Sequence, residues 1–112
     1  MEDVTITSHD HGDRGEYYAA VADSSAIGRL TWTRHGDVRT AEHTLVPSEI
    51  GGRGIAGMLV EALIADARGK GFKINPQCSY VAAAFRRHPE WADLRACRYA
   101  GENCLIWLYR VP

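Results

Sequence analysis

A glycine-rich turn, Gly51-Gly52-Arg53-Gly54, is the part of the sequence whose residue types point most directly to chemistry. It follows a stretch with the composition of a strand and precedes one with the spacing of an amphipathic helix. Glycines at the start of a helix let several unpaired backbone N–H groups converge on an anion, and a phosphate or pyrophosphate suits such a turn. Glycines can also serve only the geometry of a loop that enters a helix, and the cluster alone does not decide between the two.

Two nucleotide-binding patterns fit this turn poorly. The spacing Gly52-x-Gly54-x-x-Gly57 matches the dinucleotide-binding fingerprint, but that fingerprint needs an acidic residue about 20 positions later, at the end of the next strand. The corresponding strand ends in Asn75-Pro76. No Gly-Lys-Ser/Thr follows the turn, which excludes a nucleoside triphosphate loop. A dinucleotide-binding half-domain is therefore the weakest interpretation.

His43 and Cys78 are the candidates for proton transfer and nucleophilic chemistry. Histidine changes its charge near neutral pH, and a thiol at a helix N-terminus, as predicted for Cys78, has a lowered pKa. Without further information the same residues also fit a buried core histidine and an inert buried thiol. We expect no metal site, because the other early histidines lie near turns without ligand spacing: His9, His11 and His35.

The segment from Val4 to Val46 predicts an antiparallel meander. Its stretches are rich in β-branched and aromatic residues, are separated by Gly and Asp turns, and have no helical period. Leu30 and Trp32 alternate with polar residues, the period of a strand with one face on the core. The predicted strands are Val4–Ser8, Glu16–Val21, Ala26–Arg34 and Val38–Val46.

The second half predicts a helical crossover. Apolar residues recur at three-and-four spacing from Ile55 to Ala67, and the helix ends at Gly69 or Gly71. A strand reached through such a crossover pairs in parallel with the strand before it. The remaining predicted elements are a strand at Phe72–Asn75, a helix at Ser79–His88 and a strand at Cys104–Tyr109. We expect an α/β fold: a mixed sheet, antiparallel first, then a splayed parallel pair, with two main helices.

Four motifs give the sequence a resemblance to a known family. In chain order they are Glu42–Pro47 (EHTLVP), Gly52–Ala56 (GRGIA), Pro76–Val81 (PQCSYV) and Arg86–Trp91 (RRHPEW). Together they resemble the GCN5-related N-acetyltransferases, and in particular their small YidJ-like group, from Ala26 to Leu94. The resemblance implies the fold of that superfamily, an N-acetyltransferase activity that uses acetyl-coenzyme A, and a single domain over residues 1–112.

The resemblance also implies where coenzyme A binds. Its pyrophosphate would lie on the amides of the glycine turn, and its pantetheine arm between the two parallel strands where they splay. Gly51 stands where the superfamily has Arg or Gln, which leaves backbone contact at this position. The helix dipole explains Arg86 and Arg87 equally well, and Tyr80 can also simply pack. The implied donor-binding residues are Val46, Gly51, Gly52, Arg53, Gly54, Ile55, Ala56, Tyr80, Arg86 and Arg87.

The resemblance further assigns chemistry to the two candidate residues. Acetyl transfer needs a neutral amine and a proton for the leaving thiolate. Small members of the family carry a His and a Cys at the matching positions, which implies His43 as the base and Cys78 as acid or nucleophile. We expect both to border the splay. The acceptor is a small-molecule or peptide amine that the sequence does not identify.

Composition and charge exclude several classes of protein. Thirteen basic against fourteen acidic residues give a formal net charge of -1, so we expect no nucleic-acid partner. No apolar run reaches the roughly 18 residues of a membrane helix, so we expect no membrane partner. Three cysteines without a signal peptide predict reduced thiols and a cytoplasmic location. The sequence is compatible with a homodimer. The alternative function is that of a non-catalytic coenzyme A-binding module.

Overall fold

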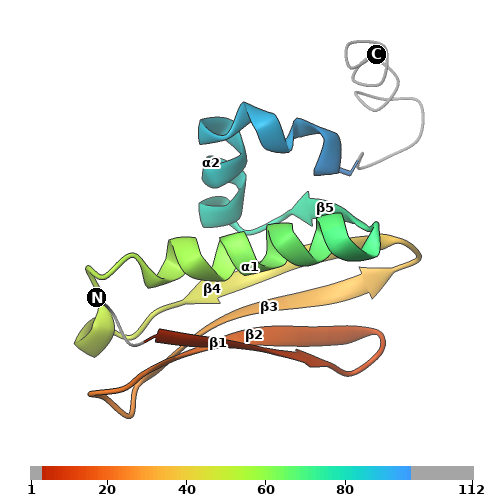
Figure 1. Cartoon of the computed structure of the whole chain (residues 1–112). Coiled ribbons are helices and arrows are strands. Elements are labelled where there is room, and N and C mark those ends of the chain that lie inside the picture. The colour runs from red at the N-terminus through yellow and green to blue at the C-terminus, as the bar shows by residue number, and fades with distance from the viewer. Residues whose placement is uncertain (1–3, 97–112) are drawn as a thin grey trace.

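The strands form one mixed sheet whose spatial order is the order of the sequence. A computed structural model describes residues 4–96, and Figure 1 shows the sheet with α1 lying across one face. Strands β1 to β4 pair antiparallel and β4 pairs parallel with β5, which confirms the predicted α/β fold. The elements are β1 (Val4–Asp10), β2 (Arg14–Val21), β3 (Ile27–His35), β4 (Val38–Leu45), η1 (Ser48–Ile50), α1 (Ile55–Lys70), β5 (Lys73–Pro76), α2 (Ser79–Arg87) and η2 (Pro89–Leu94).

Tight turns and a bulky indole shape the antiparallel half. Gly12 and Gly36 have φ of 96° and 64° in the β1–β2 and β3–β4 turns, a conformation that favours glycine. Leu30 and Trp32 are buried, which confirms the predicted alternation in β3. Gly15 lies directly opposite Trp32, and a side chain at this position would collide with the indole. The Trp32 ring therefore lies against β2 only because residue 15 is glycine.

Helix α1 packs its apolar side on the sheet and forms the centre of the core. Its last residue is Lys70, and Gly71, one of the two predicted ends, is the C-cap, with φ of 80° and an N–H that donates to the Ala67 carbonyl at 2.8 Å. Helix α2 and η2 contact α1 and join the same core. We call the side of the sheet opposite α1 the open face; Thr31 and Thr33, which alternate with the buried residues of β3, lie there. The buried residues of α1 are Ile55, Leu59, Val60, Leu63, Ile64 and Ala67.

A β-bulge in β4 changes which side chains reach the open face. Thr31 pairs with His43 and Trp32 pairs with Ala41, so Glu42 is an additional residue in β4. Directly opposite residues of an antiparallel pair point to the same face. His43 therefore shares the open face with Thr31, and Glu42 also bonds a residue of that face, because its Oε2 accepts a hydrogen bond from Thr33 Oγ1 at 3.1 Å.

The parallel strand β5 starts and ends one residue later than predicted. It spans Lys73–Pro76 in place of 72–75, and Pro76 lies opposite Ala41. Proline has no N–H for the ladder. The N–H of Cys78 donates to the Ala41 carbonyl instead, at 2.9 Å. The strand thus reaches one residue further because the chain beyond the proline supplies the missing hydrogen bond.

Helix α2 is one residue shorter than predicted and leads into η2, which the sequence did not indicate. It ends at Arg87, and the N–H of His88 donates to the Phe85 carbonyl at 3.3 Å. The ring of His88 then stacks on Trp91 with 4.0 Å between centroids. The predicted strand Cys104–Tyr109 lies outside the described residues. Within residues 4–96, no helix is long and apolar enough to cross a membrane.

Candidate functional site

The carboxyl ends of β4 and β5 lie at one edge of the sheet and diverge there. Ala41 and Pro76 are the last pair of the parallel ladder. Beyond this pair β4 continues to Leu45, whereas β5 ends and is followed by α2. Along residues 42–45, β4 has no strand partner on this side among the described residues. This is the predicted splayed pair. Ligands of α/β sheets bind outside the carboxyl ends of parallel strands, so the gap is a candidate binding site.

The glycine turn leads into α1 at this edge. Gly52 and Gly54 have φ of 77° and 74°, a left-handed conformation that favours glycine. Gly54 is the N-cap residue of α1, and no side chain caps the helix. The first helical hydrogen bond runs from the Met58 N–H to the Gly54 carbonyl at 3.1 Å. The N–H groups of the first turn therefore remain available at the positive end of the helix dipole.

The side chains of Arg53 in the turn and of Ile55, the first residue of α1, are engaged elsewhere. Arg53 Nη1 lies 3.1 Å from Asp23 Oδ1 in the β2–β3 turn, and this hydrogen bond holds the pKa of the Asp23 carboxyl below its usual value. The side chain of Ile55 is 2% exposed and belongs to the core. The turn thus offers a ligand its backbone, while Arg53 and Ile55 fix its position.

Tyr80 joins the first turns of the two helices. A Cβ at Gly57 would lie 3.7 Å from the Tyr80 hydroxyl, so the phenol lies over this glycine. Arg87 Cζ is 6.0 Å from the centre of the Tyr80 ring. Arg86 is exposed and has no hydrogen bond, ion pair or ring contact within residues 4–96. The structure therefore gathers Tyr80 and Arg87 near the start of α1 and leaves Arg86 apart. Val46 follows β4 and packs against the core.

Cys78 is the N-cap residue of α2 and lies beside the gap. It is half-buried, and its Sγ lies 3.5 Å from Thr44 Oγ1. Burial acts to raise the pKa of the Cys78 thiol, but hydrogen bonding with the Thr44 hydroxyl, to which the neutral thiol donates, and with the backbone of Val81, Tyr80 and Thr44 outweighs it. The pKa of the thiol is therefore lower than its usual value. A thiol at a helix N-terminus with such donors is a candidate nucleophile.

His43 lies on the other side of β4 from Thr44. His43 pairs with Thr31 on the open face, whereas Thr44 pairs with the buried Leu30. The His43 side chain is exposed and makes no hydrogen bond or ion pair with any described residue. Cys78 therefore contacts Thr44, whereas His43 lies on the opposite face of β4. The two predicted catalytic residues flank one strand from opposite faces.

Thr44 and Glu42 belong to the site, but the sequence did not single them out. A strict alternation that starts from the buried Ala41 would turn His43 toward the core and Thr44 toward the open face. The additional residue at Glu42 reverses this order. Nothing in the residue types of this stretch signals a bulge, so the contact between Thr44 and Cys78 could be found only from the strand register.

Comparisons with known proteins agree with this fold. Residues 16–94 match the model of a protein family described as GCN5-related N-acetyl-transferase, a range that includes the glycine turn and Cys78. The fold is similar to that of a GCN5-like protein from Staphylococcus aureus, solved by NMR in solution, with a TM-score of 0.64 and 20% sequence identity. The similarity covers 91% of this chain and 97% of that chain.

Proposed function

Because the chain belongs to the GCN5-related N-acetyltransferase family, we propose that it transfers an acetyl group from acetyl-coenzyme A to a primary amine, as a member of the small YidJ-like group. The observation that carries the proposal is the uncapped glycine turn beside the unpaired stretch of β4. Backbone donors at a helix N-terminus suit a pyrophosphate, and an open strand edge suits the amide groups of a pantetheine arm.

The donor would be held mainly by backbone groups. Its pyrophosphate would accept hydrogen bonds from N–H groups of residues 52–56, and its arm would lie along residues 42–46. Gly54 supports this placement, because it has no Cβ and its left-handed φ turns the chain into the helix beside the ligand. Tyr80 would flank the arm, and Arg87, which lies near its ring, is a cation available to a phosphate of coenzyme A.

Two routes are open for the transfer. In the direct route His43 takes the proton of the ammonium, and the amine nitrogen attacks the thioester carbonyl carbon. The C–N bond forms and the C–S bond breaks, the Cys78 thiol protonates the leaving thiolate, and the new amide nitrogen gives its second proton to the Cys78 thiolate. In the covalent route the Cys78 thiolate attacks the thioester carbon, and coenzyme A leaves as a thiolate that takes a proton from solvent. The amine, deprotonated by His43, then attacks the acetyl carbon on Cys78; the C–N bond forms, the C–S bond to Cys78 breaks, and the nitrogen gives its second proton to the released Cys78 thiolate. The lowered pKa of Cys78 supports the covalent route.

The binding half of the proposal can be tested by thermal unfolding. Coenzyme A at 100 times its Kd should raise the unfolding free energy by about 2.7 kcal/mol, and the Tm by on the order of 10 °C. Gly54→Val should remove this shift, because valine is strained at φ 74° and blocks the approach of a phosphate. Gly36→Val is the matched control, with a positive φ of 64° in a distant turn. Equal shifts in both variants would place coenzyme A elsewhere.

The catalytic half can be tested by thiol release. With acetyl-coenzyme A and a panel of primary amines, we expect an amine-dependent release of free coenzyme A. A protein that binds coenzyme A but turns over with no amine would be the non-catalytic binding module. A Tm shift with NAD and none with coenzyme A would instead indicate a dinucleotide site.

A further inference from the structure

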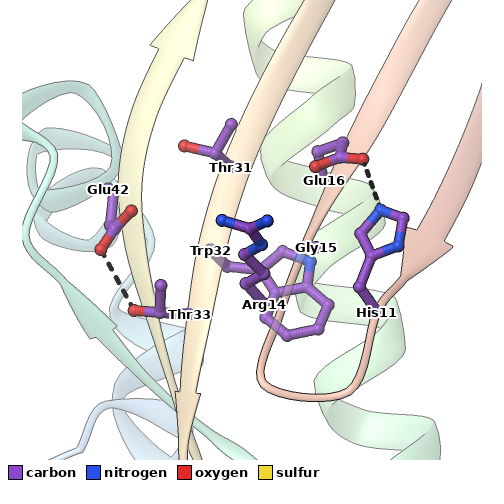
Figure 2. Close-up of a pocket in the computed structure, with 8 residues that line it drawn as sticks. All are labelled: His11, Arg14, Gly15, Glu16, Thr31, Trp32, Thr33 and Glu42. Atoms are coloured by element: carbon purple, nitrogen blue, oxygen red, sulfur yellow. Dashed lines mark hydrogen bonds and ion pairs between the residues drawn. The ribbon is translucent and has the colours of Figure 1, made fainter.

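A pocket on the open face is lined by Thr31 and by Glu42, the residue that precedes His43. Its volume is about 580 Å³, within the roughly 300–1,000 Å³ that small-molecule sites occupy. Thr31 lies in this pocket directly opposite His43, and such pairs have Cβ atoms about 4.5–5.5 Å apart. His43 itself does not line the pocket; it lies beside the pocket through Thr31 and Glu42, on the face opposite Cys78. Figure 2 shows the polar side chains of the pocket: His11, Arg14, Glu16, Thr31, Thr33 and Glu42.

Two opposite charges in this pocket have no ionic partner within residues 4–96. Glu16 is engaged, because its Oε2 lies 3.0 Å from His11 Nε2, and this hydrogen bond lowers the pKa of the Glu16 carboxyl. Among the described residues, the Glu42 carboxylate has only the neutral hydroxyl of Thr33 as a partner. Arg14 makes no hydrogen bond or ion pair with any residue in 4–96. One anion and one cation thus remain for a ligand.

The unpaired charges lie on either side of one strand. Arg14 on β2 is directly opposite Thr33 on β3, and Glu42 on β4 accepts the hydrogen bond of the same Thr33. Adjacent strands are about 4.8 Å apart, so Thr33 separates the two charges across the sheet. Figure 2 shows Arg14 in the middle of the pocket, between Glu42 on one side and Glu16 and His11 on the other. A ligand with one charge would leave a charged side chain unpaired, whereas a zwitterion can pair with both.

We propose that this pocket is the acceptor subsite and that the acceptor is a small amino acid. Its ammonium would lie at Glu42, next to His43, and its carboxylate at Arg14. A guanidinium binds a carboxylate through two parallel hydrogen bonds, which gives both affinity and orientation. Glu42 holds the amine while it is charged, and His43 takes its proton before the nitrogen attacks. This inference rests on the proposed acetyltransferase function and adds the class of substrate.

The test compares amino acids with their amides, which keep the amine and lack the negative charge. The probes are glycine, β-alanine and 4-aminobutyrate with their amides. For the best of the three acids, Arg14→Gln should lower kcat/KM by about 10- to 100-fold and leave the matching amide within about twofold. The change in the acid-to-amide ratio is the measured quantity, since the two amines differ in basicity. Arg29→Gln, which removes an exposed arginine of the open face outside the pocket, should change neither substrate.

A binding experiment separates the failure of this inference from the failure of the proposed function. The three acids are titrated into ¹⁵N-labelled full-length protein, and the amide signals of Gly15, Thr31 and Glu42 are followed by NMR. We expect saturable shifts that are absent in Arg14→Gln. Such shifts without turnover would keep the amino-acid site and remove the transferase function. Turnover with an acid-to-amide ratio that Arg14→Gln leaves unchanged, or neither turnover nor saturable shifts, would overturn the acceptor proposal.

Discussion

Removal of the Thr44 hydroxyl should make Cys78 less reactive at neutral pH and more reactive at high pH. The Thr44 hydroxyl lies 3.5 Å from Cys78 Sγ and is one of the groups that lower the pKa of this thiol. Thr44→Val keeps the shape of the side chain and removes the donor. The backbone donors of Val81 and Tyr80 remain, so the thiol keeps part of its activation.

The size of the effect follows from the strength of one hydrogen bond to a charged group. Such bonds contribute about 1.5–3 kcal/mol, and the long 3.5 Å distance between Cys78 Sγ and Thr44 Oγ1 favours the lower value. About 1.5 kcal/mol corresponds to roughly tenfold less thiolate at a pH below the midpoint of the titration. Each thiolate becomes roughly threefold more nucleophilic as its basicity rises. Alkylation at neutral pH should therefore slow by roughly threefold, and the two rate–pH curves should cross at higher pH.

The assay is alkylation by iodoacetamide across a pH series, read at the peptide that contains Cys78 by mass spectrometry, because the sequence also contains Cys97 and Cys104. Thr40→Val is the matched control. Thr40 lies on the same strand, and its Oγ1 accepts a hydrogen bond from Asn75 Nδ2 instead. Curves for Thr44→Val that coincide with those of the wild type, without a crossing, would refute the role assigned to this hydroxyl.

The remaining predictions concern the mechanism and the core. In the covalent route, acetyl-coenzyme A without acceptor should leave a hydroxylamine-sensitive acetyl group on Cys78; in the direct route no adduct forms and Cys78→Ala should lower kcat by about 10² to 10⁴. His43→Ala should lose a similar factor, and the loss should ease as pH rises because the amine deprotonates unaided. Unchanged rates in both alanine variants would remove the chemistry assigned to them. The guanidinium of Arg39 lies between the rings of Trp32 and Phe72, at 4.1 and 4.0 Å, and its Nη atoms lie 3.5 and 3.8 Å from carboxylates of Asp10 and Asp66. Arg39→Met removes these ring contacts and ion pairs and should lower the urea-derived unfolding free energy by about 1–3 kcal/mol. The loss stays in this range because the partly exposed carboxylates of Asp10 and Asp66 can rehydrate; equal or greater stability would contradict this.

The sequence predicts those parts of the fold that depend on the order of residue types along a short stretch of chain. Alternation in β3, the spacing of apolar residues from Ile55 to Ala67 and the left-handed glycine at 71 each depend on neighbours along the chain. The parallel pairing of β4 with β5 follows from the handedness of a crossover. These rules place the glycine turn and the start of α2 at one edge without any knowledge of tertiary contacts.

The parts that escape prediction depend on which strands meet in which register. The additional residue at Glu42 turns His43 to the open face and Thr44 to the thiol, yet its residue type is ordinary for a strand. The same holds for Gly15, whose necessity appears only when Trp32 lies opposite it. The pocket at Arg14 combines a turn with three strands, and no spacing along the chain indicates such a combination.

The match between strand order and sequence order also determines how the chain can fold. Each strand pairs with the one just before it, so no strand has to wait for a distant partner to be synthesised. Short loops close at small entropic cost, and topologies rich in such contacts fold fast. The longest connection, from β4 to β5, contains α1, which can form locally while the hairpins assemble. During synthesis, strands β1 to β4 would thus leave the ribosome before Cys78. The thiol would reach its place beside β4 only after that strand has formed.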